Sequence, residues 1–275
     1  MLRYLLALSR PRFWLYLAGP VLVGVAFGAA SVSALFGTEA VVLFAYFLLP
    51  ANVYLYGVND VFDADIDREN PKKDDKEVRY RGQSTVAIVV AASGLLLIPV
   101  AVVLPQRTWG WLVGWLLLAT AYSVPPLRLK TTPFFDSLSN GLYILPGAAA
   151  YAALAGVQPP LLAVVGGWLW SMAMHTFSAI PDIEPDRAAG IRTTATVLGH
   201  RRTYWYCAAT WTGAAIAFGL LDWRLGLALA VYPVLVGAIA AREIDVDRAY
   251  WWYPAVNSFV GALITIGGLW RLVYG

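Results

Sequence analysis

Long apolar segments alternate along the chain with short segments that hold most of the charged residues. Nine such apolar segments are present, at residues 13–36, 40–62, 85–104, 109–125, 134–156, 161–180, 203–221, 225–241 and 250–271. A helix needs about 20 apolar residues to cross the hydrocarbon core of a bilayer. The pattern therefore predicts an all-α membrane protein with nine transmembrane helices, formed as one domain over residues 1–275.

The composition agrees with this interpretation. Charged residues make up 13% of the chain and hydrophobic residues 59%, with a mean hydropathy of +0.62, whereas a soluble domain carries about 25% charged residues. Soluble nucleic-acid-binding and protein-binding roles are thereby excluded. Cys207 is the single cysteine, so an intrachain disulfide and a cysteine-rich metal site are excluded as well.

The distribution of basic residues predicts the orientation in the membrane. If the N-terminus is cytoplasmic, every Lys and Arg except Arg107, Arg224 and Arg271 falls in a cytoplasmic segment, as the positive-inside rule requires. The first apolar segment is too long for the apolar region of a signal peptide, and we expect it to remain as the first span. The prediction is a multi-pass protein of the cell membrane.

Two acidic clusters lie at the expected cytoplasmic ends of the second and sixth segments. Asp60, Asp63 and Asp67 are spaced three and four residues apart, and Asp182 and Asp186 four apart, so each set shares one face of a helix. Like charges in this arrangement repel one another unless a cation neutralises them, and Mg²⁺ prefers such oxygen ligands together with phosphates. One cluster alone would be read as a solvated loop. Two at equivalent positions predict that these five aspartates bind Mg²⁺ and act in catalysis at the cytoplasmic side.

Several polar residues are candidates for binding a substrate. Cytoplasmic loops are basic for reasons of topology alone, but four cations near the acidic clusters are candidates for a diphosphate: Arg79, Arg128, Lys130 and Arg192. Asn140 and Asn257 lie inside apolar segments, where a polar side chain is costly, and either lines a cavity or bonds to a neighbouring helix. Asp136 is interpreted as a helix N-terminal residue, and His175 as a core histidine.

Three motifs resemble those of the UbiA superfamily of intramembrane prenyltransferases. They are Asn-Asp-x-x-Asp-x-x-x-Asp at 59–67, Tyr-Ser-x-Pro-Pro-x-Arg-x-Lys at 122–130, and Asp-x-x-x-Asp at 182–186 followed by Gly190 and Arg192. The chain departs from the commoner pattern at Ala179 and Pro185, where many members carry Asp and Gly. The segment 177–186, with Asn-Pro-Lys-Lys at 70–73, looks most like the lycopene elongase branch.

This resemblance implies a helical bundle around a cavity open to lipid, and a Mg²⁺-dependent transferase. The donor would be a prenyl diphosphate, dimethylallyl diphosphate in this branch. The acceptor would be an apolar isoprenoid, lycopene, in carotenoid biosynthesis. Asn59 and Tyr122 join the substrate-binding candidates. We expect membrane lipid as a further partner and no nucleic acid.

Two alternatives stay open. Within the same family, the acceptor could be an aromatic quinone precursor or a glycerol-phosphate lipid. A membrane transporter is the alternative from another class, although transporters place substrate sites near the bilayer midplane. Here the ionisable residues gather at the inner ends of the apolar segments and are scarce at their centres, which favours the enzyme.

Overall fold

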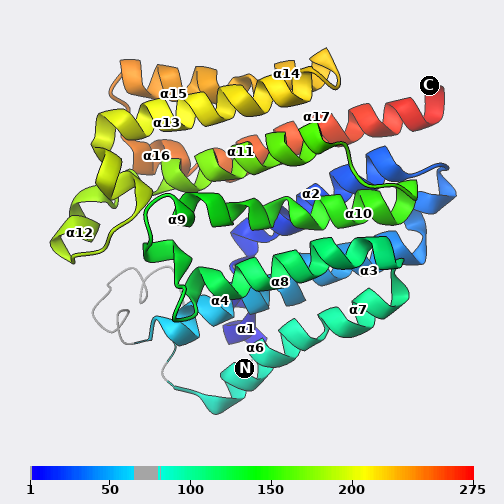
Figure 1. The fold of residues 1–275 in the computed structure, drawn as a ribbon, viewed down its shortest axis with the longest axis horizontal. Coiled ribbons are helices and arrows are strands. Elements are labelled where there is room, and N and C mark those ends of the chain that lie inside the picture. The colour runs from blue at the N-terminus through cyan, green and yellow to red at the C-terminus, as the bar shows by residue number, and fades with distance from the viewer. Residues whose placement is uncertain (1, 65–79, 81) are drawn as a thin grey trace. The chain divides into compact units, whose positions relative to one another are not determined.

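The computed structural model describes residues 2–64, 80 and 82–275, and every regular element within these ranges is a helix (Figure 1). The chain divides into two compact units. The first comprises Met1–Arg128, Leu145–Gln158 and Leu269–Gly275, and the second Leu129–Ile144 and Pro159–Gly268.

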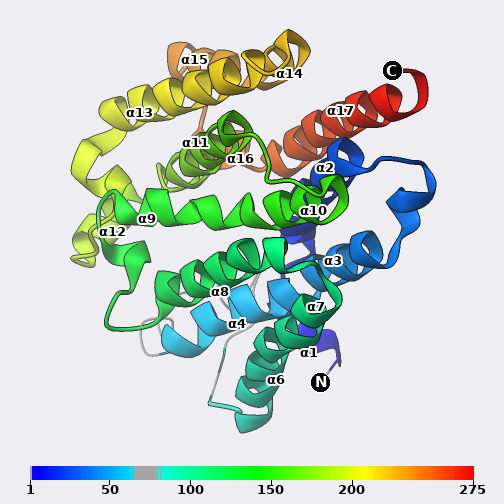
Figure 2. The same cartoon turned by 45° about the vertical axis from the view of Figure 1, so that its right-hand side comes forward.

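The first unit is built from apolar helices joined by short turns. In chain order its elements are α1 (Leu2–Leu8), η1 (Pro11–Phe13), α2 (Trp14–Gly28), η2 (Ser33–Phe36), α3 (Thr38–Leu48), α4 (Pro50–Phe62), α6 (Ser84–Leu95), α7 (Leu97–Val103), η4 (Gln106–Thr108), α8 (Trp109–Ser123) and α10 (Leu145–Ala155). Helices α2 and α10 pack side by side (Figures 1 and 2). Glycines permit this approach, because a Cβ built on Gly24 would lie 2.2 Å from the carbonyl oxygen of Gly147.

The second apolar segment forms two helices rather than one. Helix α3 ends at Leu48 and α4 begins at Pro50, a position where proline is tolerated because its missing N–H has no helical partner. The amide of Asn52 donates to the carbonyl oxygens of Phe47 and Leu48, at 2.9 and 3.0 Å. These bonds satisfy carbonyl groups at the end of α3 that helix bonds do not reach.

The second unit contains the remaining helices. They are η5 (Leu129–Thr131), α9 (Phe135–Leu138), η6 (Ser139–Tyr143), α11 (Leu161–Ser178), α12 (Ile183–Ala188), α13 (Thr194–Gly219), α14 (Trp223–Leu229), α15 (Val231–Ala241), α16 (Val246–Tyr250) and α17 (Tyr253–Tyr274), whose last residues belong to the first unit. Helices α11 and α13 pack together, and α13 is kinked at Gly199, where φ is +70°. Buried rings fill the space between helices, with Phe177 and Trp211 centred 5.6 Å apart.

Six stretches of the described chain are long and apolar enough to cross a membrane. They are Pro11–Gly28, Thr38–Phe62, Ser84–Val103, Leu161–Ser178, Trp223–Ala241 and Val246–Tyr274. The other three predicted segments are helical but shorter, broken or more polar. Helix α8 has 15 residues, the segment 134–156 is divided among α9, η6 and α10, and α13 contains the polar sequence His200-Arg201-Arg202.

Candidate active site

The first acidic motif lies at the end of α4. Asp60 is buried, with 3% of its surface exposed, and Arg10 Nη2 lies 3.5 Å from Asp60 Oδ1. The Arg10 guanidinium also lies over the ring of Tyr56, 4.7 Å from its centroid. Arg10 occupies the turn between α1 and η1 with a left-handed φ of +49°. A residue that the sequence marked only as a topological cation therefore contacts a predicted metal ligand.

Asp63 is the residue at which α4 terminates. Its backbone N–H donates to the carbonyl oxygen of Asn59 at 3.0 Å, the last helical bond of α4. Its carboxylate accepts a 2.6 Å hydrogen bond from Arg128 Nη2. Ser123, at the end of α8, donates to Asn59 Oδ1 at 3.0 Å. The C-terminal end of α8 and the residues after it thus make two hydrogen bonds to the C-terminal end of α4.

The other residues predicted to act with this motif lie in different parts of the chain. Tyr122 lies in α8 and is partly buried, and Lys130 lies in η5 of the second unit. Asp67 and Arg79 lie outside the described residues. The helical face predicted for three aspartates therefore has two described members, Asp60 in α4 and Asp63 as its C-cap.

The second acidic motif lies on the short helix α12. Asp182 is its N-cap, and the N–H of Asp186 donates to the carbonyl oxygen of Asp182 at 2.8 Å, so the two aspartates are one helical turn apart. Both are partly buried, whereas Glu184 is exposed and lies 3.0 Å from Arg187 Nη1. Arg192 is exposed in the connection between α12 and α13. This arrangement separates the two aspartates from Glu184, as the spacing predicts.

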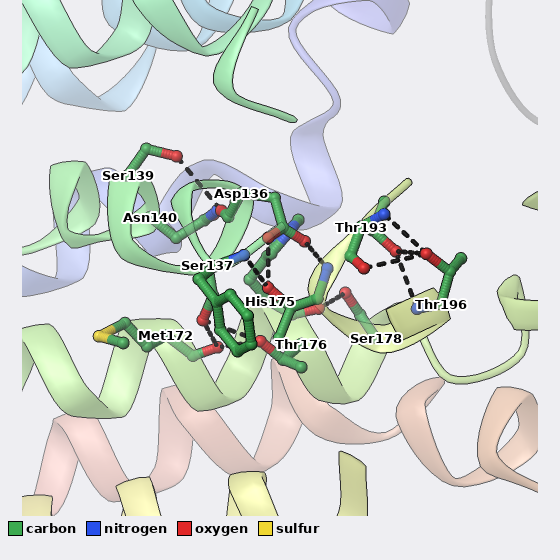
Figure 3. A network of polar contacts seen from close by, with 12 residues as sticks. Asp136, Ser137, Ser139, Asn140, Met172, His175, Thr176, Ser178, Thr193 and Thr196 are labelled. Atoms are coloured by element: carbon green, nitrogen blue, oxygen red, sulfur yellow. Dashed lines mark hydrogen bonds and ion pairs between the residues drawn. The ribbon is translucent and has the colours of Figure 1, made fainter. Parts of the chain in front are cut away.

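A buried polar network in the second unit was missed by the sequence interpretation (Figure 3). Asp136 lies in the first turn of α9, where the sequence predicts it. Its carboxylate accepts hydrogen bonds from the backbone N–H of Thr194, at 2.9 Å, and from the Thr194 hydroxyl. His175 Nε2 lies 3.7 Å from Asp136 Oδ2. The available signal was an acidic residue inside an apolar segment, which is costly without specific partners.

The two asparagines differ in what they bond. Asn140 is buried and donates to the carbonyl oxygen of Asp136 at 2.6 Å, within the same stretch of chain. Asn257 of α17 accepts a 2.8 Å hydrogen bond from the Tyr232 hydroxyl of α15. Asn257 thus joins neighbouring helices, one of the two roles expected for such residues.

Several aromatic side chains in the two units make ordinary packing contacts. The Tyr54 hydroxyl and Thr120 Oγ1 are hydrogen-bonded at 2.7 Å. Phe177 is fully buried and its ring lies 5.0 Å from that of Tyr253. Trp170 packs against Tyr232 with ring centroids 5.8 Å apart. These rings build the helix interfaces of each unit.

The donor sets fit a magnesium ion that is shared with a phosphate ligand. Among the described residues, no three His, Cys, Asp or Glu side chains converge as a complete metal shell. Each acidic motif instead supplies two carboxylates one turn apart. Mg²⁺ is usually held by one or two carboxylates together with substrate phosphates and water, so a pair of this kind suffices.

Apolar helices with paired carboxylates and arginines at their ends define an integral membrane protein with a polar site at a helix terminus. The model of the UbiA prenyltransferase family matches residues 17–270. The chain therefore belongs to the UbiA prenyltransferase family.

Curated relatives match almost the whole chain. A lycopene elongase/hydratase of Haloferax volcanii is 67% identical over 272 residues, which cover 99% of this chain and 90% of that protein. A lycopene elongase/hydratase of Halobacterium salinarum is 64% identical and covers both chains completely. Within its family the chain thus groups with the lycopene elongase branch.

Solved structures share the fold. A UbiA homologue from Archaeoglobus fulgidus, bound to DMAPP and Mg²⁺, superimposes with a TM-score of 0.74 over 97% of this chain and 99% of its own, at 18% identity. The form of the same homologue bound to GPP and Mg²⁺ gives 0.75. The helical architecture described above is therefore the UbiA fold.

Proposed function

We propose that this protein is a Mg²⁺-dependent prenyltransferase that transfers a dimethylallyl group from its diphosphate to lycopene, in the synthesis of longer carotenoids. The observation that carries the proposal is the pairing of Asp60 with Arg10 and of Asp63 with Arg128. Carboxylates for a metal and guanidinium groups for phosphate oxygens are what a metal-bound diphosphate requires. The 67% identity to a lycopene elongase/hydratase supports the acceptor.

Each acidic motif is proposed to bind Mg²⁺: the first through Asp60 and Asp63, with Asp67 as a further ligand from outside the described residues, and the second through Asp182 and Asp186. When bound, the ion would stabilise negative charge on the departing diphosphate. Arg128 presents guanidinium donors beside Asp63, and Arg10 does the same beside Asp60. Their role is to bind phosphate oxygens and orient the allylic bond for cleavage.

Other polar residues of the chain support this arrangement. Ser123 holds the side chain of Asn59, which keeps its amide at the end of α4. Tyr122, Lys130, Arg192 and Asn140 remain proposed substrate contacts, as does Arg79. The acceptor is apolar, and its terminal double bond attacks the allylic carbon while water is excluded. The resulting tertiary cation is then quenched by water or loses a proton to a base.

We also propose nine membrane spans, with the N-terminus and both acidic motifs at the cytoplasmic side. Six stretches satisfy length and hydropathy. The proposal adds α8, the α9–η6–α10 stretch and α13 as three further spans. Short or broken helices are tolerated in a membrane where neighbouring helices satisfy the free backbone groups.

The test is transfer by purified protein in lipid vesicles that contain lycopene, supplied with dimethylallyl diphosphate and Mg²⁺. Products heavier by one or two five-carbon units are expected from the wild type and absent from Asp63→Ala. Asp247→Ala, which removes an exposed aspartate, is the matched control and should stay active. Release of diphosphate without a carotenoid product would redirect the acceptor to an aromatic or lipid substrate. No turnover of any prenyl donor would reject the enzyme and make transport the hypothesis to test.

A further inference from the structure

Asp136 and Thr194 form a joint between segments that are far apart in the sequence of the second unit. Asp136 is completely buried, and a buried carboxylate is costly unless its oxygens are hydrogen-bonded. Oδ2 accepts from the Thr194 backbone N–H at 2.9 Å, and Oδ1 accepts from the Thr194 hydroxyl. Both oxygens are thus engaged by one residue, which lies 58 positions later in the chain.

Thr194 also connects to the turn that precedes α9. Its Oγ1 accepts a 2.7 Å hydrogen bond from the backbone N–H of Phe134. Phe134 has a left-handed φ of +67°, a conformation that costs free energy for a bulky residue and needs support from its surroundings. The Thr194 hydroxyl therefore acts as donor to Asp136 and as acceptor from Phe134 at the same time.

The joint connects two segments that carry proposed diphosphate-binding residues. Lys130 lies in η5, shortly before Phe134, and Arg192 lies two positions before Thr194. The connection from α12 to α13 is held at further points, because Ile191 N–H donates to the Asp186 carbonyl oxygen at 2.8 Å. Arg187 Nη2 likewise donates to the Thr196 carbonyl oxygen at 2.7 Å. Asp186 and Arg192 thus lie on a connection that is held by internal hydrogen bonds, and Thr194 at its end is bound to Asp136.

We infer that Asp136 and Thr194 are positioning residues for the diphosphate of the donor. The joint sets the separation between the segment of Lys130 and the segment of Asp186 and Arg192. A displacement of about 1 Å in a group that orients a substrate can cost about a hundredfold in rate. This inference rests on the proposed function, because it assigns the joint to the diphosphate that the transferase would bind.

The test compares Thr194→Val with Thr194→Ser in lipid nanodiscs. Valine keeps the size of the side chain but removes the hydroxyl that serves both Asp136 and Phe134, whereas serine retains it. Ser137→Ala is the matched control, because Ser137 is buried in the same network and hydrogen-bonded to Tyr206 at 2.9 Å. No hydrogen bond between Ser137 and Thr194 is present among the described contacts.

Four quantities are measured for each variant: the Kd for inorganic diphosphate with Mg²⁺ by calorimetry, KM and kcat for the prenyl donor, and the unfolding temperature. Thr194→Val should weaken diphosphate binding and raise KM by about tenfold or more, because without the hydroxyl's bonds to Asp136 and Phe134 the segments that carry Lys130 and Arg192 can shift out of position. Thr194→Ser and Ser137→Ala should keep the Kd for diphosphate and the KM for the prenyl donor within about twofold of the wild type. This should hold even if Ser137→Ala lowers the unfolding temperature as far as Thr194→Val does.

Two results would overturn the inference while leaving the proposed function intact. In the first, wild type binds diphosphate and Thr194→Val binds it equally well. In the second, Ser137→Ala weakens binding as much as Thr194→Val, so that binding follows stability alone. A wild-type protein that binds no diphosphate and transfers no prenyl group would overturn both the inference and the proposed function.

Discussion

The hydrogen bond between Arg128 and Asp63 should contribute to the stability of the protein as well as to its activity. The two side chains lie 2.6 Å apart and are 28% and 12% exposed, so solvent screens the pair only in part. Hydrogen bonds to charged groups contribute about 1.5–3 kcal/mol, and removal of one partner also leaves the other charge poorly solvated. Arg128→Gln and Asp63→Asn should each lower the free energy of unfolding by about 1–3 kcal/mol.

The double variant Arg128→Gln/Asp63→Asn separates the two effects. Two neutral amides can hydrogen-bond to each other, so the double variant should recover at least about 1 kcal/mol of the summed loss in stability. It should not recover prenyl transfer, because neither a carboxylate for the metal nor a guanidinium for the diphosphate is left. For Arg128→Gln alone, kcat/KM should fall by about a hundredfold, which corresponds to about 2.7 kcal/mol.

The assay pairs reversible unfolding in mixed micelles with transfer in vesicles for the wild type, both single variants and the double variant. Arg128→Lys is the conservative control, since it keeps the charge but loses the planar donor geometry, and it should recover part of the activity. If the loss in unfolding free energy of the double variant equals the sum of the two single losses to within about 0.3 kcal/mol, the two side chains do not interact in the membrane. Wild-type kcat/KM in Arg128→Gln would refute the role of Arg128 in binding the diphosphate.

Three further predictions address packing, metal and topology. Gly24→Ala should destabilise the protein by about 1–3 kcal/mol, because its Cβ would lie 2.2 Å from a carbonyl oxygen of α10. Gly19→Ala should leave the stability unchanged, because nothing lies within 4 Å of its Cβ position. The free energy of unfolding of each variant is measured in micelles. Removal of Mg²⁺ with a chelator should abolish transfer, and added Mg²⁺ should restore it. In a Cys207→Ala background, Glu184→Cys should react with an impermeant thiol reagent from the cytoplasmic side, and Asp222→Cys from the opposite side.

Each of these predictions has a result that would contradict it. Equal unfolding free energies for the two alanine variants would show that α2 and α10 do not pack through glycine in the membrane. Full transfer in the chelator would reject the metal. Labelling of both cysteines from the same side would reject the proposed number of spans between them or the proposed orientation.

The residues of the first acidic motif could be proposed from local spacing, but their partners could not. The positions of Asp60 and Asp63 follow from a helix repeat, which depends on neighbouring residues only. Arg128 was a candidate through its motif. Arg10 was read as a topological charge, because its contact with Asp60 joins residues 50 positions apart and no local pattern encodes such a pair.

The partners of Asp136 likewise could not be predicted from the sequence. Its placement near the N-terminus of a helix could be predicted from the sequence, and Asp136 does lie in the first turn of α9. The hydrogen bonds that its two carboxylate oxygens accept from Thr194 could not be predicted in this way. A carboxylate in an apolar setting binds whatever donors the folded chain brings to it, and those donors lie on another helix.

Apolar patterning and charge distribution were enough to identify a helical membrane protein, and three short motifs were enough for its family, because hydropathy, helix periodicity and motif spacing are local properties. The tertiary structure decided where helices break, such as α3 and α4 at Pro50 and α13 at Gly199. It also decided which cation meets which carboxylate. Those outcomes depend on packing between segments distant in the chain, where steric fit and the cost of burying an unpaired charge select one arrangement from many.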